Sequence, residues 1–193
     1  VNACSAVRDA IQMWQSYPSA PVEFLFQTID LLWRYRIHPL APHDCSTTCM
    51  FSFLNRLNNL IVAQLGDGAC VIRDSGGKVT ILDDTSDGFT NTTRGLGATA
   101  DVEKWKFVER KDIEAGYSIL LATDGVSEDV ERERLGDMTF DLISEYRPLD
   151  SKERWINLCK ELRDWSTPHH LDDKTIAAMW IEPFLSGEDN CDS

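Results

Sequence analysis

Apolar residues near the start of the chain recur every three or four positions, which is the spacing of one face of an α-helix. The first stripe consists of Ala3, Ala6, Val7, Ala10, Ile11 and Trp14, and the second of Val22, Leu25, Phe26, Ile29, Leu32 and Trp33. Two amphipathic helices are therefore predicted, with both stripes in the core. The proline-rich segment 38–43 cannot continue the second helix. Its histidines, His38 and His43, are interpreted as ordinary surface residues.

From residue 46 onward the apolar residues form short runs rich in β-formers, separated by turn residues. Strands are predicted at residues 47–54, 60–65, 69–73, 78–82 and 105–109. The turns contain Asn58-Asn59, Gly66-Asp67-Gly68 and Asp74-Ser75-Gly76-Gly77. Such short connections predict an antiparallel meander and weigh against a parallel, nucleotide-binding α/β fold. Residues 83–101 lack periodicity and are predicted to form a long loop or flap.

Two further buried strands are predicted in the second half of the chain. Residues 119–122 are continuously apolar, which is typical of a strand covered on both faces, and residues 176–181 form a similar run. Gly125 allows a sharp turn after the first of them, because glycine accepts backbone angles that other residues avoid. This turn carries Asp124 and Glu128, two of the candidate functional residues.

Helices are predicted between these two strands, and a tail after the second. The first helix covers residues 130–146, with an interruption near Gly136, and the second follows a cap at Asp150 or its neighbour. The acidic end, residues 186–193, is interpreted as a frayed tail. Residues 1–185 are then expected to form a single domain, since 42% of the chain is hydrophobic and an ordinary core can be built.

The chain is strongly acidic, because 19 Lys and Arg residues against 32 Asp and Glu residues give a formal net charge of −13. This balance weighs against nucleic acid or an anionic membrane as a partner and suits divalent cations. No apolar run approaches the length of a membrane span, and no signal peptide is visible. The six cysteines lack the spacing of zinc ligands. Reduced, mostly buried thiols in a cytoplasmic protein are therefore expected.

Three acidic turns lie at the ends of predicted strands. They contain Asp67, Asp124 with Glu128, and Asp172-Asp173. Carboxylates that converge from separate strands repel one another unless a cation neutralises them, and hard oxygen ligands of this kind favour Mg²⁺ or Mn²⁺. The alternative is three independent turns in which Asp and Gly serve only the backbone geometry and Asp124 caps a helix. Spacing alone leaves both interpretations open.

Five segments resemble, in the same order, motifs of the metal-dependent serine/threonine protein phosphatases of type 2C, the PPM family, and especially its compact bacterial form. They are Cys45-Ser46-Thr47-Thr48, Ala63-Gln64-Leu65-Gly66-Asp67-Gly68, Phe89-Thr90-Asn91-Thr92-Thr93, Leu120-Leu121-Ala122-Thr123-Asp124-Gly125-Val126 and Leu171-Asp172-Asp173-Lys174-Thr175-Ile176. The fourth is similar to the family's central metal motif. The fifth is similar to its closing motif, in which many relatives carry Asp-Asn.

The resemblance implies an α+β fold, an α-β-β-α sandwich of two antiparallel sheets flanked by helices, with a two-metal site at one edge. Asp124 and Asp172 match the core ligands of two Mn²⁺ or Mg²⁺ ions. Asp67 matches an acid of an additional, more weakly held metal site, and Glu128 falls near that same outer metal. Asp173 stands where relatives have Asn and is expected to support the ligands from behind.

The resemblance also implies an activity. Members of the family hydrolyse phosphoserine and phosphothreonine in proteins, and a water activated by two cations attacks the phosphorus directly. The implied cofactor is Mn²⁺ or Mg²⁺, and the implied partner is a phosphoprotein substrate.

One motif of the family has no match in the sequence. The family's first metal-binding Asp-Gly pair precedes the first helix, whereas Val1 already falls within the predicted helix, so the N-terminal strands are expected to be missing. Asp87-Gly88 cannot substitute, because it falls in the predicted flap. Without that bridging carboxylate, weak or no activity is expected of the 193-residue chain. An Asp-Gly pair upstream of Val1 would restore the interpretation as an enzyme.

Two alternatives stay open. The chain could be a naturally shortened, non-catalytic relative that serves as a binding or regulatory module. It could also be an unrelated hydrolase of the haloacid dehalogenase class, to which Ala122-Thr123-Asp124-Gly125 bears a faint resemblance. That class needs a nucleophilic Asp two residues before a second Asp, and residue 122 is Ala, so this alternative ranks last.

Overall fold

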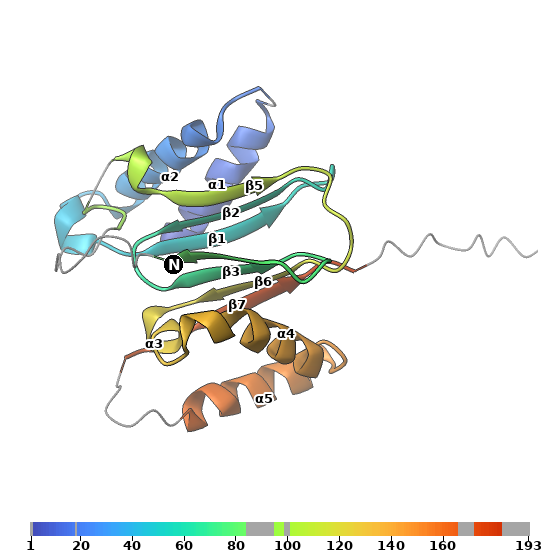
Figure 1. Ribbon diagram of the computed structural model, residues 1–193. Helices are drawn as coiled ribbons and strands as arrows, with labels where there is room; N and C mark the ends of the chain where they lie inside the picture. Colours follow the sequence, from blue (N-terminus) through green and yellow to red (C-terminus); the bar gives the residue numbers. More distant parts are fainter. Residues whose placement is uncertain (1, 18, 84–94, 99–100, 166–171, 183–193) are drawn as a thin grey trace, which may run out of the picture.

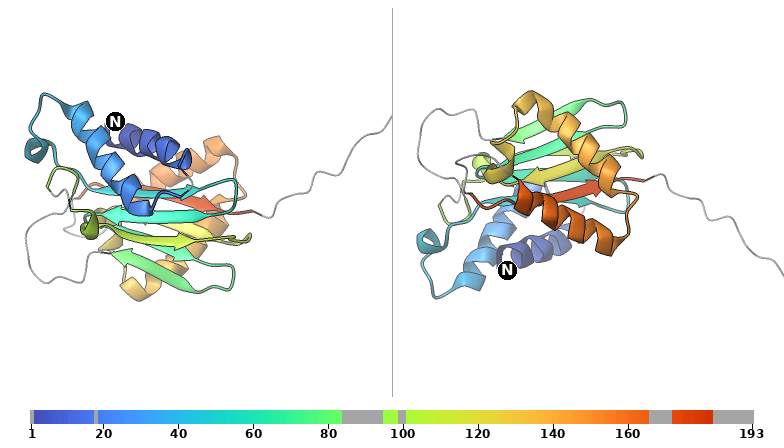
Figure 2. Two further views of the ribbon diagram at one scale, coloured as in Figure 1. Left: turned by 90° about the horizontal axis from the view of Figure 1, so that it is seen from above. Right: turned by 90° about the horizontal axis from the view of Figure 1, so that it is seen from below.

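The computed structural model describes residues 2–17, 19–83, 95–98, 101–165 and 172–182, and within them it forms a four-layer sandwich (Figure 1). Helices α1 (Asn2–Gln15) and α2 (Val22–Ile37) cover one sheet, and α4 (Leu135–Tyr146) and α5 (Ser151–Asp164) cover the other (Figure 2). Short helices η1 (Pro42–Cys45), η2 (Val102–Lys104), α3 (Asp124–Ser127) and η3 (Arg132–Arg134) lie in the connections. The predicted α+β sandwich of two antiparallel sheets flanked by helices is confirmed.

Seven strands form the two sheets within the described residues. They are β1 (Cys49–Leu54), β2 (Leu60–Leu65), β3 (Ala69–Arg73), β4 (Val79–Asp83), β5 (Lys106–Arg110), β6 (Ser118–Ala122) and β7 (Ile176–Trp180). One sheet has the order β1-β2-β5 and the other the order β4-β3-β6-β7. Every pairing between these strands is antiparallel, so the alternative that requires a parallel-sheet dehalogenase domain is wrong.

The predicted simple meander is wrong at one connection. Strands β2 and β3 follow one another in the sequence but belong to different sheets, so the turn at residues 66–68 carries the chain from one sheet to the other. Gly66 and Gly68 make this crossing possible, since their φ angles of 106° and 94° are ones that side-chain-bearing residues rarely adopt. Local turn chemistry predicted the reversal, and tertiary packing decided where the second strand pairs.

All six residues of β2 are buried, because the strand is covered on both faces. Ile61 and Ala63 face the core beneath α1 and α2, while Leu60 and Val62 face the core between the two sheets. Strands β3 and β6 alternate in the same way between the core between the sheets and a third core under α4. The sandwich therefore contains three stacked apolar layers.

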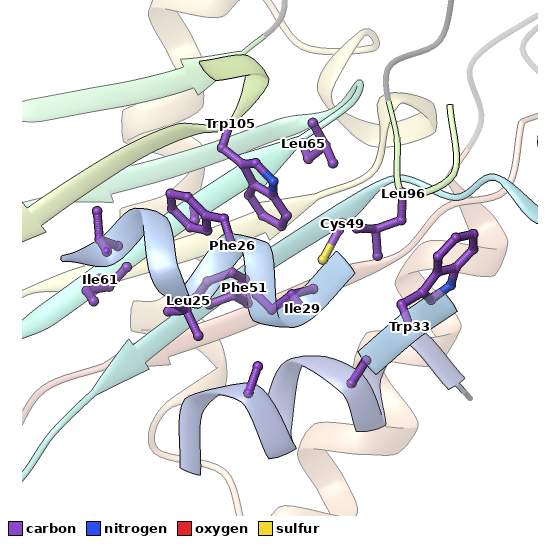
Figure 3. Close-up of a cluster of buried hydrophobic side chains, with 14 of the residues drawn as sticks. Leu25, Phe26, Ile29, Trp33, Cys49, Phe51, Ile61, Leu65, Leu96 and Trp105 are labelled. Atoms are coloured by element: carbon purple, nitrogen blue, oxygen red, sulfur yellow. The ribbon is translucent and has the colours of Figure 1, made fainter. Parts of the chain in front are cut away.

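The core beneath α1 and α2 is built around aromatic side chains of α2 and of the adjacent sheet (Figure 3). Phe26 is 1% exposed, and its ring stacks on Trp105 with the ring centroids 4.6 Å apart. Phe51 meets Trp105 edge to face at 6.0 Å. These contacts fix α2 on the three-stranded sheet and confirm that the stripe on the second predicted helix is a core face.

Two details of the C-terminal half differ from the sequence prediction. The last strand, β7, is an edge strand with exposed Ala177 and Ala178, whereas a buried strand was predicted. All five of its residues are exposed or half-buried, because β6 pairs with only one of its two edges. The helix predicted at residues 130–146 is divided before Leu135, and Gly136 lies inside α4. A Cβ at Gly136 would lie 2.5 Å from Val79 Cγ2, so this glycine allows α4 to approach β4.

Several predictions fall on residues that the structure does not describe. Most of the predicted flap, including residues 89–93, lies outside the described residues, as does the predicted tail at 186–193. The boundary of the single domain at residue 185 therefore stays a prediction. Among the described helices, none combines the length and apolar character that a membrane crossing requires.

The described cysteines are free thiols that differ widely in exposure. Cys49 and Cys70 are buried, Cys45 and Cys159 are half-buried, and Cys4 is exposed. The expectation of mostly buried thiols is thus only partly met. Burial raises the pKa of both the Cys49 and the Cys70 thiol to about 12, because the charged thiolate is not solvated there.

We expect iodoacetamide at pH 8 to alkylate Cys4 in the native protein and to leave Cys49 and Cys70 unmodified. Since the thiolate is the reactive species, raising a thiol pKa from 9.0 to about 12 lowers its population at this pH by about 1,000-fold. Mass spectrometry of the alkylated peptides measures the difference. Unfolding in urea should make all three reactive, and equal labelling in the native protein would contradict the burial.

Candidate functional site

The three acidic turns meet at one end of the sandwich. Strand register places Ala69 opposite Ala122 and Ala122 opposite Ile176, so the segments that flank these residues lie at the same sheet end. The turn containing Asp67 lies directly against the one containing Asp124, since a Cβ built on Gly68 would be 3.4 Å from Asp124 N. The predicted convergence of the turns is therefore present in the backbone.

Gly125 packs against the closing turn at residues 172–173. A Cβ at Gly125 would lie 2.7 Å from the carbonyl oxygen of Asp173 and 3.1 Å from that of Asp172. No side chain fits between the two backbones at this distance. The glycine after Asp124 is thus required for close approach of the two turns as well as for ending the strand.

Thr123 joins β6 to the same closing turn. Its hydroxyl donates to the carbonyl of Asp173 at 3.1 Å and accepts from the amide of Thr175 at 2.9 Å. Its backbone amide donates to the Thr175 carbonyl at 3.0 Å. Thr123 also occupies the N-cap position of α3, and Asp124 is the first residue within that helix. The interpretation of Asp124 as the helix cap is therefore wrong.

Gln64 supports the turn that contains Asp67. This side chain is 1% exposed, and its Nε2 donates to the carbonyls of Gly66 and Gly68 at 3.0 and 2.9 Å. The two bonds close the turn on either side of Asp67, so the loop cannot open without leaving a buried amide unsatisfied. A polar residue within the apolar run 60–65 was the signal for this role in the sequence.

A cavity of about 380 Å³ lies between the turn containing Asp67 and the end of α3, and it is lined by Asp67 and Glu128, the two residues predicted near an outer metal, but by neither Asp124 nor Asp172. Asp83 and Arg132 also line it, and Arg132 Nε donates to Asp83 Oδ2 at 2.5 Å. This hydrogen bond and the carboxylate charge raise the pKa of the Arg132 guanidinium. The cavity wall therefore combines acidic oxygens with a permanently charged cation that the sequence did not reveal.

The carboxylates differ in exposure. Asp67 and Asp124 are half-buried, while Glu128, Asp172 and Asp173 are exposed. In residues 2–182, apart from the stretches the structure leaves undescribed, no three His, Cys, Asp or Glu side chains gather closely enough to hold a metal ion. The structure thus brings the turns together and places Asp67 and Glu128 in one cavity. The roles of all five residues as ligands or supports stay predictions.

The oxygen donors suit a hard divalent cation in their chemistry. Carboxylates are the ligands that Mg²⁺ and Mn²⁺ prefer, and neither sulfur nor imidazole lines the cavity. The turn containing Asp124 packs closely against the turn containing Asp67 through Gly68 and against the closing turn through Gly125.

Comparison with known proteins gives one family and a consistent set of folds. Residues 2–166 match the sequence model of a family described as protein phosphatase 2C. No curated protein sequence matches the chain.

Solved structures match over most of the chain. The phosphatase domain of the cell fate determinant SpoIIE from Bacillus subtilis, presoaked with Mn, matches 94% of this chain and 73% of its own, at 14% identity and a TM-score of 0.52. The catalytic domain of the serine/threonine protein phosphatase PstP, in complex with two manganese ions, matches 91% of this chain and 78% of its own, at 17% identity and a TM-score of 0.54. RsbX in complex with magnesium matches 93% of this chain and 73% of its own, at 16% identity and a TM-score of 0.50.

Proposed function

The chain belongs to the protein phosphatase 2C family, and we propose on that basis that a protein combining this chain with the family's upstream Asp-Gly pair hydrolyses phosphoserine and phosphothreonine in proteins with Mn²⁺ or Mg²⁺ as cofactor. The observation that carries this proposal is the meeting of the Asp67, Asp124 and Asp172 turns at one sheet end. Structures of similar fold contain manganese or magnesium, which supports the choice of ions.

Asp124 and Asp172 would hold the two core cations, and Asp67 with Glu128 would hold an outer one. Bound Mn²⁺ or Mg²⁺ would neutralise charge on the phosphoryl oxygens and lower the pKa of a water. The contribution of the chain is to fix the oxygen donors before binding. Thr123 and Gln64 contribute hydrogen bonds to the backbone of the turns, so the segments that carry the carboxylates are held in place before a cation binds.

Arg132 adds a positive charge to a strongly acidic wall. Its Nε is engaged by Asp83, and its side chain is 53% exposed. A guanidinium has five donors in a planar fork, so the remaining donors are available to a phosphorylated substrate. This placement supports a substrate that approaches the turns through the cavity.

Release of inorganic phosphate from a phosphoseryl peptide tests the proposal. From the 193-residue chain, which has no match to the family's first Asp-Gly pair, we expect weak or no release. When such a pair precedes Val1, we expect release with Mn²⁺ or Mg²⁺, and loss of release when EDTA removes the cation. Restoring Mn²⁺ after chelation should restore the rate, which separates metal dependence from denaturation. Phosphate release without metal that persists in both Asp124→Asn and Asp172→Asn variants would contradict the proposal.

A further inference from the structure

A buried ion pair lies directly behind the candidate metal turns. Lys174 Nζ is 3.0 Å from Asp129 Oδ2, and the two side chains are 10% and 5% exposed. Lys and Asp are rarely buried to this degree unless they are paired. A buried pair gains little net stability from charge attraction, because both groups lose their hydration. The main effect of the Lys174–Asp129 pair is then to fix the relative position of the segments that carry the two side chains.

Lys174 connects the two turns that carry the predicted core ligands. It lies two residues after Asp172 in the closing turn, and its ammonium donates to the carbonyl oxygen of Gly125 at 2.5 Å. Gly125 directly follows Asp124, while Asp129 stands just beyond the end of α3. A single side chain of the closing turn therefore holds α3 at both of its ends.

Trp165 fixes the other side of Asp129. Its indole Nε1 donates to Asp129 Oδ2 at 3.0 Å, from the C-cap position of α5. The carboxylate thus receives donors from the end of α5 and from the closing turn, both of which are distant from Asp129 in the sequence. This arrangement leaves Asp129 little freedom to rotate away from Lys174.

We propose that Lys174 and Asp129 are positioning residues for the candidate metal centre. The pair locks the turn containing Asp124 against the turn containing Asp172, and it neutralises the lysine charge that would otherwise repel a cation there. The inference rests on the proposed function, because the two turns are positioned for a metal. Lys174 is itself no ligand, since an ammonium has no lone pair to offer. Its loss therefore loosens the ligands without removing one.

Lys174→Met is the primary test, because methionine keeps much of the aliphatic stem and removes the ammonium. Trp165 still donates to Asp129 in this variant. We expect the Kd for Mn²⁺, measured by isothermal titration calorimetry, to rise about 10- to 100-fold, as for other groups that orient metal ligands. In the metal-free protein we expect faster hydrogen exchange in peptides covering residues 123–129 and 172–175. Lys174→Arg should recover part of the affinity.

Arg147→Met is the matched control. It also replaces a cation by methionine, but the pair of Arg147 with Glu182 is at the surface, with side chains 51% and 55% exposed. Glu182 follows the far end of β7 from the closing turn. The Mn²⁺ affinity of Arg147→Met and its hydrogen exchange at the two turns should equal those of the wild type. The variant Asp129→Asn removes the other charge of the pair. If it fails to fold, the double variant Asp129→Asn/Lys174→Met removes both charges together and should bind Mn²⁺ as weakly as Lys174→Met does.

A purely structural role for the pair predicts a different result. A lower Tm for Lys174→Met, with Mn²⁺ affinity within twofold of the wild type and unchanged exchange at the two turns, would overturn the inference. The proposed function can fail separately: if the wild type binds Mn²⁺ but releases no phosphate, weaker binding by Lys174→Met still supports the positioning role. A wild type that binds no Mn²⁺ would overturn both.

Discussion

In a protein that combines this chain with the family's upstream Asp-Gly pair, replacing Asp124 by Asn is expected to lower kcat/KM for Mn²⁺-dependent phosphate release by at least about 100-fold. Groups that only orient a ligand already cost 10- to 100-fold when removed, so loss of the ligand itself should cost more. Asn has nearly the same shape and keeps a carbonyl oxygen that can accept the present bond from the Gly125 amide, 2.8 Å away. The fold should therefore survive, and the loss should be traceable to the missing charge.

Asp112→Asn is the control for this substitution. Asp112 is exposed in a turn after β5, and its φ of 50° is one that Asn adopts readily. The rate of phosphate release by Asp112→Asn should match that of the wild type. Phosphate release is measured over a range of Mn²⁺ concentrations, so that weaker metal binding is separated from slower turnover. Asp124→Asn with unaltered kcat and unaltered Mn²⁺ dependence would exclude Asp124 as a ligand.

Phe26→Ala is expected to lower the free energy of unfolding by about 3–5 kcal/mol, the usual cost of emptying a phenylalanine site in a core. Phe26 is 1% exposed. Its replacement removes both the stacking on Trp105 and an edge contact with Phe107 at 5.4 Å. For a chain of this length the Tm should fall by roughly 6–20 °C. Urea unfolding followed by tryptophan fluorescence measures the change.

Phe24→Ala is the matched control, since it removes the same side chain from the same helix. Phe24 is 37% exposed and contacts Tyr17 edge to face at 6.2 Å. Its loss should cost about 1 kcal/mol or less. Equal destabilisation by the two substitutions would mean that α2 does not pack on the three-stranded sheet through the face that contains Phe26.

Periodicity was sufficient to predict nearly every helix and strand, because burial on one face leaves a repeating mark on the sequence. It could not predict sheet membership. Strands β2 and β3 are separated by only three residues yet pair in different sheets, since the choice of partner depends on residues distant in the sequence. The same limit explains β7, whose apolar residues suggested a buried strand although it lies at a sheet edge.

The candidate site was predictable only in its acidic turns. Asp67, Asp124 and Asp172 stand beside glycines or strand ends, which made them visible. Lys174 and Asp129 gave no such signal, because each is an ordinary charged residue until the fold brings them together and buries them. Side-chain contacts between distant segments leave no periodic trace, so the supports of a site are harder to predict than its candidate ligands.

The turn closed by Gln64 has a consequence for how the family fold can vary. This turn is one of the connections that carry the chain from one sheet to the other, and Asp67 lies on it, whereas Asp124 and Asp172 flank strands of the four-stranded sheet alone. The relative position of these turns therefore depends on the apolar core between the sheets, to which Val62 and Ile72 both belong. A volume change in this core is therefore expected to shift the turn containing Asp67 relative to the turns containing Asp124 and Asp172.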